Sequence, residues 1–416
     1  MFYHNPTKRD NSTGEGVFIL NNYIEQNLLL EKKLEELELS PTMFNLAKSR
    51  YTSLGVYLQK FDKSLNIYPQ GSMRLGTVVR PFRGEMDAEY DIDTVLEFGK
   101  DKGNVTPEWV KQTTKEYLVV DETYKKLLDK EKKRCWTLQY AEDGNAVGFH
   151  MDILPGVKED TKTINSIVTN GTNMYFLQKA ISITQKKKDN SYEWNPSNPA
   201  GYADWFYSVN YPLKADKLRN FQSVIFNNYR GVFASIDEVP EQLVKTSLQR
   251  VIMVLKRHRD VYFSRKHNED DKPISIIITT LATLIVQENH ITTENTLELL
   301  ALVSRLLLEY KDYKVNPKKT FSVNYRVLKI NDSKWVIPNP VNSNENFADA
   351  WNDGTERKAK AFFEWLEAIQ KDIINNISSP NFINVLIEKL ALKPIKQEEK
   401  KAMPSIITAC TKPYRG

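Results

Sequence analysis

The chain has 416 residues, of which 41% are hydrophobic and 27% are charged, and its formal net charge is +5. This length accommodates two or three domains, or one large two-lobed unit, with sizeable cores. The weak positive charge argues against a dedicated nucleic-acid-binding protein and suits one that handles small polyanions such as nucleoside triphosphates.

Two helices are predicted at the start of the chain. Residues Val17–Leu39 carry apolar residues at helical spacing with many Glu and Lys between them. Ser40 and Pro41 then fit the N-cap and first position of a second helix that runs to about Lys60.

The next region, up to about Val157, is rich in predicted strands. Glu89–Phe98 alternates, so that Asp91 and Asp93 fall on one face and the larger apolar residues on the other. Two further strands are predicted at Arg134–Ala141 and Ala146–Val157, with a hairpin turn at 142–145 between them. The polar, Pro- and Asn-rich residues 186–201 predict an exposed connection.

From about residue 240 the pattern becomes helical. Predicted helices cover Pro240–Phe263, Ile274–Glu288, Thr293–Tyr310, Glu356–Asn376 and Pro380–Leu392. The order of helices, a small mixed sheet and then a helical bundle predicts an α+β protein with two lobes and a cleft between them. We expect N-terminal helices at 1–60, a catalytic core at 61–215, a helical lobe at 216–395 and a flexible tail at 396–416.

Cysteine, histidine and apolar content restrict the class further. Two distant cysteines and five scattered histidines argue against a disulfide framework and a structural zinc site. The N-terminal residues contain no apolar segment typical of a secretory signal, and no run approaches the roughly 18 apolar residues of a membrane span. We therefore expect a cytoplasmic protein without a membrane partner.

Three carboxylates are the main candidates for chemistry. Asp91 and Asp93 lie two apart on a strand and project from the same face. Asp152 alternates in the same way on a later strand that could pair beside the first. Such a set can bind two magnesium ions for phosphoryl transfer. A lone D-x-D pair is more often two solvated acids on an edge strand.

Gly71 and Ser72, upstream of the D-x-D pair, favour the metal-site interpretation over the two solvated acids. A glycine permits close backbone approach to a phosphate, and the serine hydroxyl with the following amides can donate to phosphate oxygens. This is no Walker P-loop, because no G-K-[ST] follows. Arg74 and Arg80 flank the segment and either steer a nucleotide or pair with a carboxylate structurally.

With these motifs the sequence resembles the polymerase-β-like nucleotidyltransferases. "YPQGSMRLGTVVRP", "EYDIDTVLEF" and "GFHMDILPGV" resemble most closely the bacterial cGAS/DncV-like branch, the signal synthases of CBASS anti-phage defence. The resemblance extends over about residues 15–390. It implies a two-lobed polymerase-β-like fold, with a mixed-sheet catalytic lobe and a helical-bundle C-terminal lobe.

The resemblance also implies roles for individual residues. Asp91, Asp93 and Asp152 would be catalytic and would bind two Mg²⁺ ions, which Mn²⁺ could replace. Gly71 and Ser72 would hold the donor phosphates. A lysine and a serine of the helical lobe also grip the triphosphate in this family, and the residues that match by pattern are Lys256 and Ser275. The alternatives are a lysine in a solvated charge run and an ordinary first-turn serine.

The activity implied is template-independent joining of NTPs, ATP or GTP above all, into a cyclic di- or trinucleotide that acts through an effector protein. The alternatives are transfer to a protein, a tRNA or an antibiotic, or a catalytically silent nucleotide-binding regulator. Some members are conjugated at a C-terminal small residue by an operon-encoded E1–E2-like enzyme, which makes Gly416 a candidate conjugation site; a terminal glycine by chance is the alternative. The mild charge and the few Cys and His argue against direct activation by nucleic acid.

Overall fold

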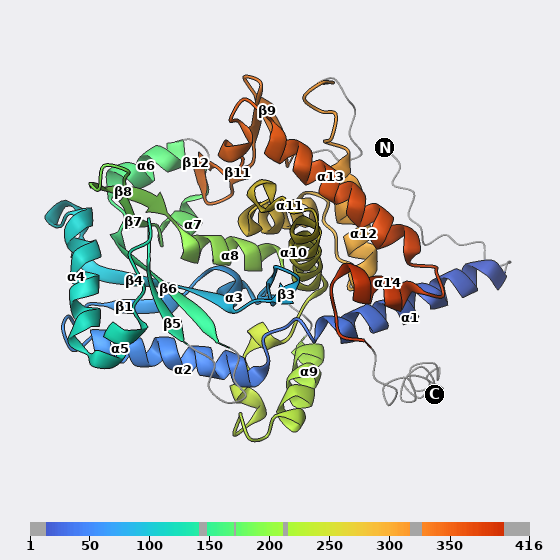
Figure 1. The fold of residues 1–416 in the computed structure, drawn as a ribbon, viewed down its shortest axis with the longest axis horizontal. Coiled ribbons are helices and arrows are strands. Elements are labelled where there is room, and N and C mark those ends of the chain that lie inside the picture. Colours follow the sequence, from blue (N-terminus) through green and yellow to red (C-terminus); the bar gives the residue numbers. More distant parts are fainter. Residues whose placement is uncertain (1–13, 141–147, 170–171, 211–214, 317–326, 395–416) are drawn as a thin grey trace.

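A computed structural model describes residues 14–140, 148–169, 172–210, 215–316 and 327–394. In this part of the chain, a mixed sheet with its covering helices forms one lobe and a helical bundle forms the other (Figure 1). The predicted α+β architecture with two lobes is confirmed.

The sheet positions the candidate site. Its strands are β1 (Asn66–Pro69), β4 (Tyr90–Asp101), β5 (Trp136–Tyr140), β6 (Phe149–Lys158), β7 (Ile181–Lys186) and β8 (Tyr192–Ser197). They run in the order β1-β4-β6-β7-β8. The same edge of β6 pairs with β5 at residues 149–153 and with β7 at residues 156–158. Only the β4–β6 pair of this sheet is parallel within the described residues.

The two faces of β4 differ as the alternation predicts. Tyr90, Ile92 and Phe98 are buried in one apolar cluster with residues of α2 (Pro41–Leu58) and α4 (Pro107–Val120). Asp91 and Asp93 point to the opposite face, away from α2 and α4. The sheet is therefore packed on one side and available for chemistry on the other.

The start of α2 follows from its capping residues. The Ser40 hydroxyl accepts a hydrogen bond from the Met43 amide at 3.2 Å, and Pro41 occupies the first turn. Helix α4 begins in the same way, with Thr106 as its N-cap and Pro107 in its first turn. Neither α4 nor α5 (Glu122–Leu127) was predicted from the sequence.

The second lobe has one large apolar core. It contains α10 (Ser247–Arg265), α11 (Ser275–Glu288), α12 (Thr296–Leu308), α13 (Arg357–Asp372) and α14 (Phe382–Lys389), joined by α1 (Gly14–Leu34). Helix α10 is buried on nearly all sides and lies at its centre. The core also takes in α8 (Pro199–Val209), which lies before the predicted boundary at residue 215.

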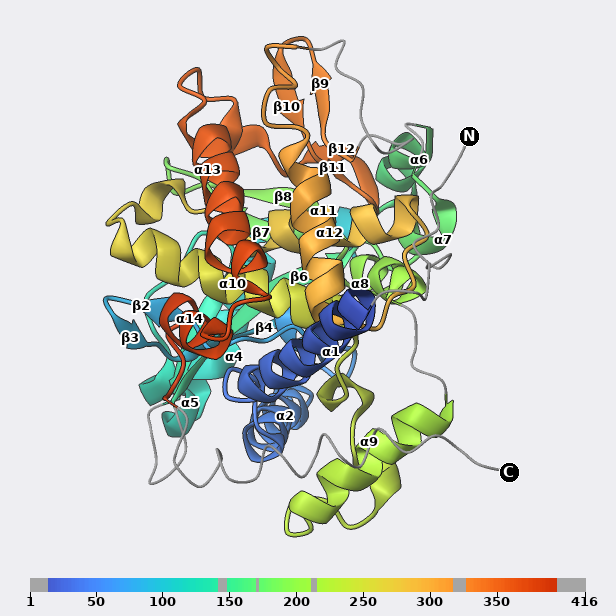
Figure 2. The same ribbon diagram turned by 90° about the vertical axis from the view of Figure 1, so that its right-hand side faces the viewer.

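Shorter elements complete the chain. They are α3 (Gly71–Leu75), β2 (Phe82–Arg83), β3 (Met86–Asp87), α6 (Thr161–Thr169), α7 (Met174–Leu177), α9 (Ala215–Asn228), β9 (Lys329–Asn331), β10 (Lys334–Val336), β11 (Pro338–Asn339) and β12 (Asn342–Asn346). Helix α9 projects from one end of the molecule in both views (Figure 2).

Several predicted boundaries were wrong. The exposed connection expected at residues 186–201 contains β8, an edge strand whose weak alternation and internal Pro196 hid it. The helix expected from Pro240 begins only at Ser247, because Thr246 and Gln249 form a capping box there. Helix α1 ends at Leu34, five residues before the predicted end at Leu39.

Two further expectations concern a turn and a membrane span. The turn predicted at 142–145 lies outside the described residues. Among the described helices, none combines the length and apolarity that crossing a membrane requires.

Candidate active site

The three carboxylates share one edge of the sheet. In the parallel β4–β6 pair, Asp93 lies directly opposite Asp152, and Asp91 lies opposite His150. Residues two apart on a strand share a face, so all three aspartates project to the same side. The structure thus brings together the acids that the sequence places on separate strands.

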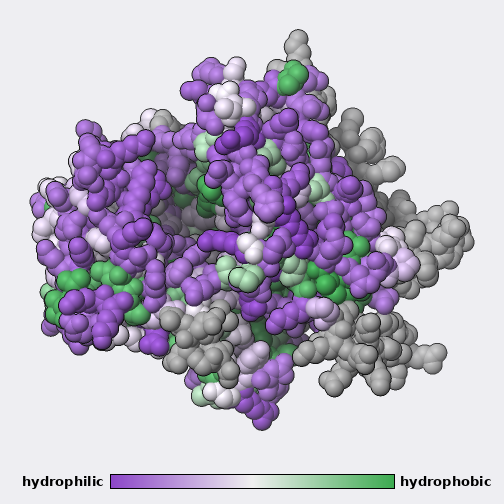
Figure 3. Space-filling model, in the orientation of Figure 1, coloured by the Kyte–Doolittle hydropathy of each residue, from purple (hydrophilic) through white to green (hydrophobic). Residues whose placement is uncertain are grey.

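All seven candidate residues within the described chain line one cleft between the lobes. The cleft has a volume of ≈ 760 Å³, and its lining includes Gly71, Ser72, Asp91, Asp93, Asp152, Lys256 and Ser275. A hollow between the lobes is visible on the molecular surface, and its surroundings are mostly hydrophilic (Figure 3). Gly416 lies outside the described residues.

Gly71 is fixed by its backbone and by Asp93. Its φ is +57°, a left-handed backbone conformation that residues other than glycine rarely adopt. A Cβ atom there would lie 2.7 Å from Oδ2 of Asp93. The preceding amide, of Gln70, donates to the Asp93 carbonyl at 2.8 Å. The start of α3 is therefore held against β4, with Ser72 facing the cleft.

The carboxyl group of Asp93 has an unusual pKa. Burial first, and then the negative charges of Asp152 and Asp91, raise its pKa from 3.8 to about 7 against opposing contributions from Lys256 and Lys132. The charges of the two neighbouring acids therefore oppose the ionisation of Asp93. A bound cation of high charge would relieve that repulsion.

The two outer carboxylates are each held by cations or hydroxyl groups. Asp152 accepts from the Thr137 hydroxyl and lies 3.2 Å from Nζ of Lys132. Asp91 lies 3.7 Å from Nη2 of Arg83 and 3.6 Å from Nδ1 of His150. As these side chains stand, no three acidic, His or Cys groups of the described residues are spaced to bind a metal ion.

Lys132 and Arg83 were not predicted as site residues. Lys132 belongs to the run at 131–134 that reads as solvated surface, and only its distance to Asp152 reveals its place in the cleft. His150 pairs with Glu89 at 2.8 Å. No sequence signal separates these residues from ordinary surface charge.

Helix α10 connects the phosphate segment to the helical lobe. Gln249 and Lys256 are seven residues apart, which places them on one face of the helix. The Gln249 amide donates to the Leu75 carbonyl at 2.8 Å, and Lys256 donates to the Thr77 carbonyl at 2.9 Å. Burial and the neighbouring Arg259 cation lower the pKa of Lys256 to about 8. Lys256 is therefore a buried cleft residue and not part of a solvated charge run.

Ser275 is the first residue of α11 and is exposed to the cleft. Its hydroxyl accepts a hydrogen bond from Nη1 of Arg259 at 3.0 Å, and the same nitrogen donates to the Pro273 carbonyl. Arg259 is itself paired with Asp260 at 2.7 Å. The hydroxyl is thus oriented by a buried cation, with its proton available to a ligand.

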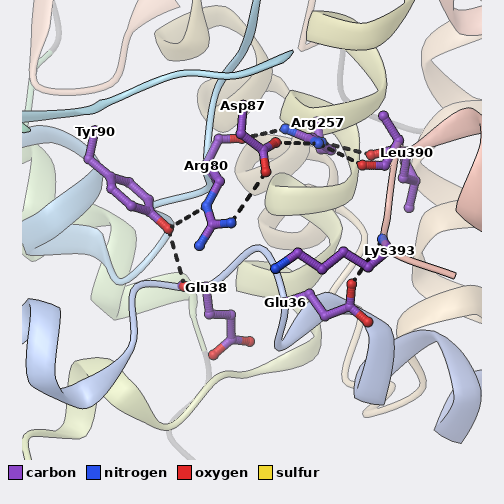
Figure 4. Close-up of polar contacts among 9 residues, drawn as sticks. Glu36, Glu38, Arg80, Asp87, Tyr90, Arg257, Leu390 and Lys393 are labelled. Atoms are coloured by element: carbon purple, nitrogen blue, oxygen red, sulfur yellow. Dashed lines mark hydrogen bonds and ion pairs between the residues drawn. The ribbon is translucent and has the colours of Figure 1, made fainter. Parts of the chain in front are cut away.

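Arg257 ties three segments together behind the cleft (Figure 4). It is fully buried, and it donates to the carbonyl groups of Arg80, Leu390 and Ala391 and to the Asp87 carboxylate. Its guanidinium also lies 4.9 Å from the centre of the Phe82 ring. These contacts join α10, the β2–β3 hairpin and the segment after α14.

The flanking arginines are structural neighbours of the cleft. Arg80 pairs with Asp87 at 3.2 Å and donates to the Tyr90 hydroxyl, so it is a partner for a carboxylate. The guanidinium of Arg74 lies 5.9 Å from the centre of the Tyr68 ring, and Arg74 is not among the residues that line the cleft.

Comparison with known proteins agrees with this arrangement. Residues 66–154, which carry Gly71, Ser72 and all three aspartates, match the model of the DncV-like cyclic GMP-AMP synthase nucleotidyltransferase domain. A c-di-GMP synthase from Roseivirga ehrenbergii is 28% identical over 332 residues, which cover 79% of this chain and 73% of the relative. Residues 66–154 therefore match a DncV-like nucleotidyltransferase domain, and most of the chain is similar to a cyclic dinucleotide synthase.

Solved structures of other nucleotidyltransferases share the fold. The GTP complex of an enzyme from Bradyrhizobium diazoefficiens covers 89% of this chain and 98% of its own, at 18% identity and a TM-score of 0.60. The ATP complex of an Escherichia coli enzyme covers 87% and 95%, at 13% identity and a TM-score of 0.54. Both share the two-lobed fold of this chain.

Proposed function

We propose that this nucleotidyltransferase joins two nucleoside triphosphates into a cyclic dinucleotide. The observation that supports it best is the convergence of three aspartates with Gly71, Ser72 and Lys256 in one cleft between the lobes. A relative that spans most of the chain is a c-di-GMP synthase, which favours a two-nucleotide ring containing guanine.

The carboxylates of the cleft are donors of the type that Mg²⁺ prefers, although in their present positions they are not spaced around one ion. Asp91, Asp93 and Asp152 supply carboxylate oxygens from adjacent strands, and magnesium prefers such oxygens together with water and substrate phosphates. The raised pKa of Asp93 indicates charge repulsion that a divalent cation relieves. When bound, these ions or Mn²⁺ neutralise phosphate charge and lower the pKa of an attacking hydroxyl.

The residues of the chain position the reactants. Gly71, Ser72, Lys256 and Ser275 hold the phosphates of the donor nucleotide, and Asp152 orients the ribose hydroxyl of the acceptor. That hydroxyl oxygen forms a bond to the donor α-phosphorus as the bond to the β-phosphate bridging oxygen breaks and pyrophosphate leaves. A second transfer between the two joined nucleotides closes the ring.

A biological role follows from the resemblance to defence enzymes. The cyclic product would act on an effector protein in anti-phage signalling of the CBASS type, and Gly416 would be joined to a partner by an E1–E2-like enzyme. Co-expression with that enzyme and mass analysis of Gly416-linked adducts test the conjugation. A variant lacking residues 396–416 that is still conjugated would rule out Gly416 as the site.

The activity is tested by incubating the purified protein with Mg²⁺ and all four NTPs, and identifying phosphatase-resistant products by mass. Asp91→Asn and Asp93→Asn should each abolish product, while Asp101→Asn, at the far end of β4, should not. A product joined to protein, tRNA or antibiotic would favour an alternative acceptor. Nucleotide binding without pyrophosphate release would indicate a silent regulator.

A further inference from the structure

The residues of the cleft follow one line across the sheet. Gly71 follows β1, Asp93 lies on β4, Asp152 lies on β6, and Lys132 precedes β5, which pairs with the far edge of β6. Neighbouring strands are about 4.8 Å apart, so the line extends over three strand spacings. The proposed donor phosphates lie at the Gly71 end, and Lys132 lies at the other.

Lys132 borders a second cavity. Besides the catalytic cleft, it lines a cavity of ≈ 820 Å³ whose walls are the segment before β5 and the β7–β8 hairpin. Five lysines line this cavity: Lys132, Lys133, Lys186, Lys187 and Lys188. The two spaces therefore meet at one lysine beside Asp152.

The acids of this cavity already have partners. Glu131 accepts from Lys186 at 2.7 Å and from the Tyr192 hydroxyl at 2.7 Å. Asp189 accepts from Ser191, and Glu193 accepts from Gln185 at 2.6 Å. These bonds leave the cavity with an excess of positive charge and hold both of its walls in place.

Three lysines are exposed there, and one of them, Lys187, lies near an acid, since its charge helps to lower the pKa of Asp189. Among the residues that the structure describes, Lys133, Lys187 and Lys188 are exposed and take part in no ion pair. The Lys186 amide donates to the Lys133 carbonyl at 2.8 Å, so the two walls are joined and the three side chains face a prepared space. Such a lysine cluster fits a polyphosphate.

We propose that this lysine-lined cavity binds the 5′-triphosphate of the acceptor nucleotide. The inference rests on the proposed function, which needs a second triphosphate-bearing nucleotide beside the donor. In-line transfer requires the acceptor hydroxyl to approach from the side opposite the leaving pyrophosphate. That side is occupied by Asp152 and Lys132, and the cavity continues from there. For ring closure, the 5′-triphosphate of the linear intermediate has to leave this cavity and take the donor position beside Gly71 and Ser72, where its α-phosphorus is attacked and the second pyrophosphate leaves.

Two kinds of nucleotide analogue, one that can only donate and one that can only accept, allow binding of the acceptor to be measured separately from binding of the donor. A 2′,3′-dideoxy-NTP donates but has no hydroxyl with which to accept. An α,β-methylene NTP accepts, but a carbon–phosphorus bond prevents it from donating. The rate of linear dinucleotide formation is measured with this acceptor and with a nucleoside 5′-monophosphate, for each base.

The test compares two triple variants of equal charge change. One carries Lys133→Gln, Lys187→Gln and Lys188→Gln, and the control carries Lys63→Gln, Lys126→Gln and Lys334→Gln, at exposed lysines outside the lining of both spaces. The first should raise KM for the triphosphate acceptor about eightfold, because each of the three exposed lysine–phosphate contacts is worth roughly a factor of two. The monophosphate acceptor, the donor KM and all kinetics of the control should stay unchanged.

Chemical footprinting gives a second measurement that needs no turnover. The α,β-methylene NTP should protect Lys133, Lys187 and Lys188 of the unmodified protein from acetylation, and the monophosphate should not. Equal acetylation with both ligands, or an equal rise in KM for both acceptors, overturns the cavity assignment while leaving the proposed function intact. Absence of any transfer by the wild-type protein overturns both.

Discussion

Replacing Asp93 with Asn should stabilise the metal-free protein at neutral and alkaline pH. Burial and two neighbouring carboxylates raise the pKa of Asp93 from 3.8 to about 7. A carboxyl group with a raised pKa favours folding while it is protonated, so its ionisation costs stability as the pH rises through the folded-state pKa. The amide of Asn carries no charge at any of these pH values.

The size of the effect follows from the shift. Each pKa unit corresponds to about 1.36 kcal/mol, so the roughly three-unit shift gives a penalty of up to about 4 kcal/mol above pH 7. At pH 5 the same arithmetic gives about 1.6 kcal/mol. The advantage of Asp93→Asn over the wild type should therefore grow by about 2.5 kcal/mol between pH 5 and pH 8, which is several degrees in Tm.

The assay is thermal unfolding in EDTA from pH 5 to pH 8, with Asp101→Asn as a matched control on the exposed end of β4. The Tm difference between Asp93→Asn and wild type should rise up to about pH 7 and then level off, while Asp101→Asn follows the wild type. Added Mg²⁺ should raise the wild-type Tm and leave Asp93→Asn nearly unchanged. A Tm difference that does not vary with pH would refute the charge repulsion assigned to this site.

Three other substitutions test the frame of the cleft. Gly71→Ala places a side chain in the left-handed region, at a cost of about 1–2 kcal/mol, and against the Asp93 carboxylate, so activity should fall. The control Gly354→Ala, where φ is +87° and no atom lies near the added Cβ, should keep activity. Equal losses of activity in the two variants would contradict the contact between residue 71 and Asp93. Lys256→Gln should raise KM for NTPs about tenfold, since a contact between the buried Lys256 ammonium and a phosphate is worth more than 1 kcal/mol. An unchanged KM would show that Lys256 does not bind the phosphates. Arg257→Met should destabilise the protein by about 2–4 kcal/mol in thermal unfolding, because it leaves three carbonyl groups without this donor and leaves Asp87 with Arg80 alone. Asp87→Asn, which keeps an acceptor at a partly exposed position, should cost less, and a larger cost than that of Arg257→Met would contradict the role of Arg257.

The sequence predicted the core of the site because its signal is local. Alternation on one strand places Asp91 and Asp93 on the same face, and the same period on a later strand places Asp152 there. The two-lobed architecture followed from the order of strands and helices. Ser40 and Pro41 located the start of α2 because capping is a short-range interaction.

The features of the site and fold that the sequence did not predict depend on contacts between segments far apart in the chain. Lys132 acquires its place only through the pairing of β5 with β6, and Arg83 through a hairpin folded toward Asp91. Lys256 is distinguished from its neighbouring charges by the Thr77 carbonyl, 179 residues away in the chain. Strand β8 was missed because an edge strand needs little apolar alternation.

The most direct test of the account is the mass of the product formed from NTPs and Mg²⁺ by the purified protein. We expect a phosphatase-resistant cyclic dinucleotide with release of two pyrophosphates per ring, absent from Asp91→Asn and Asp93→Asn and present in Asp101→Asn. Undiminished synthesis by the Asp91 or Asp93 variant would contradict the assignment of the aspartates, and the absence of any nucleotide product from the wild-type protein would contradict the proposed function.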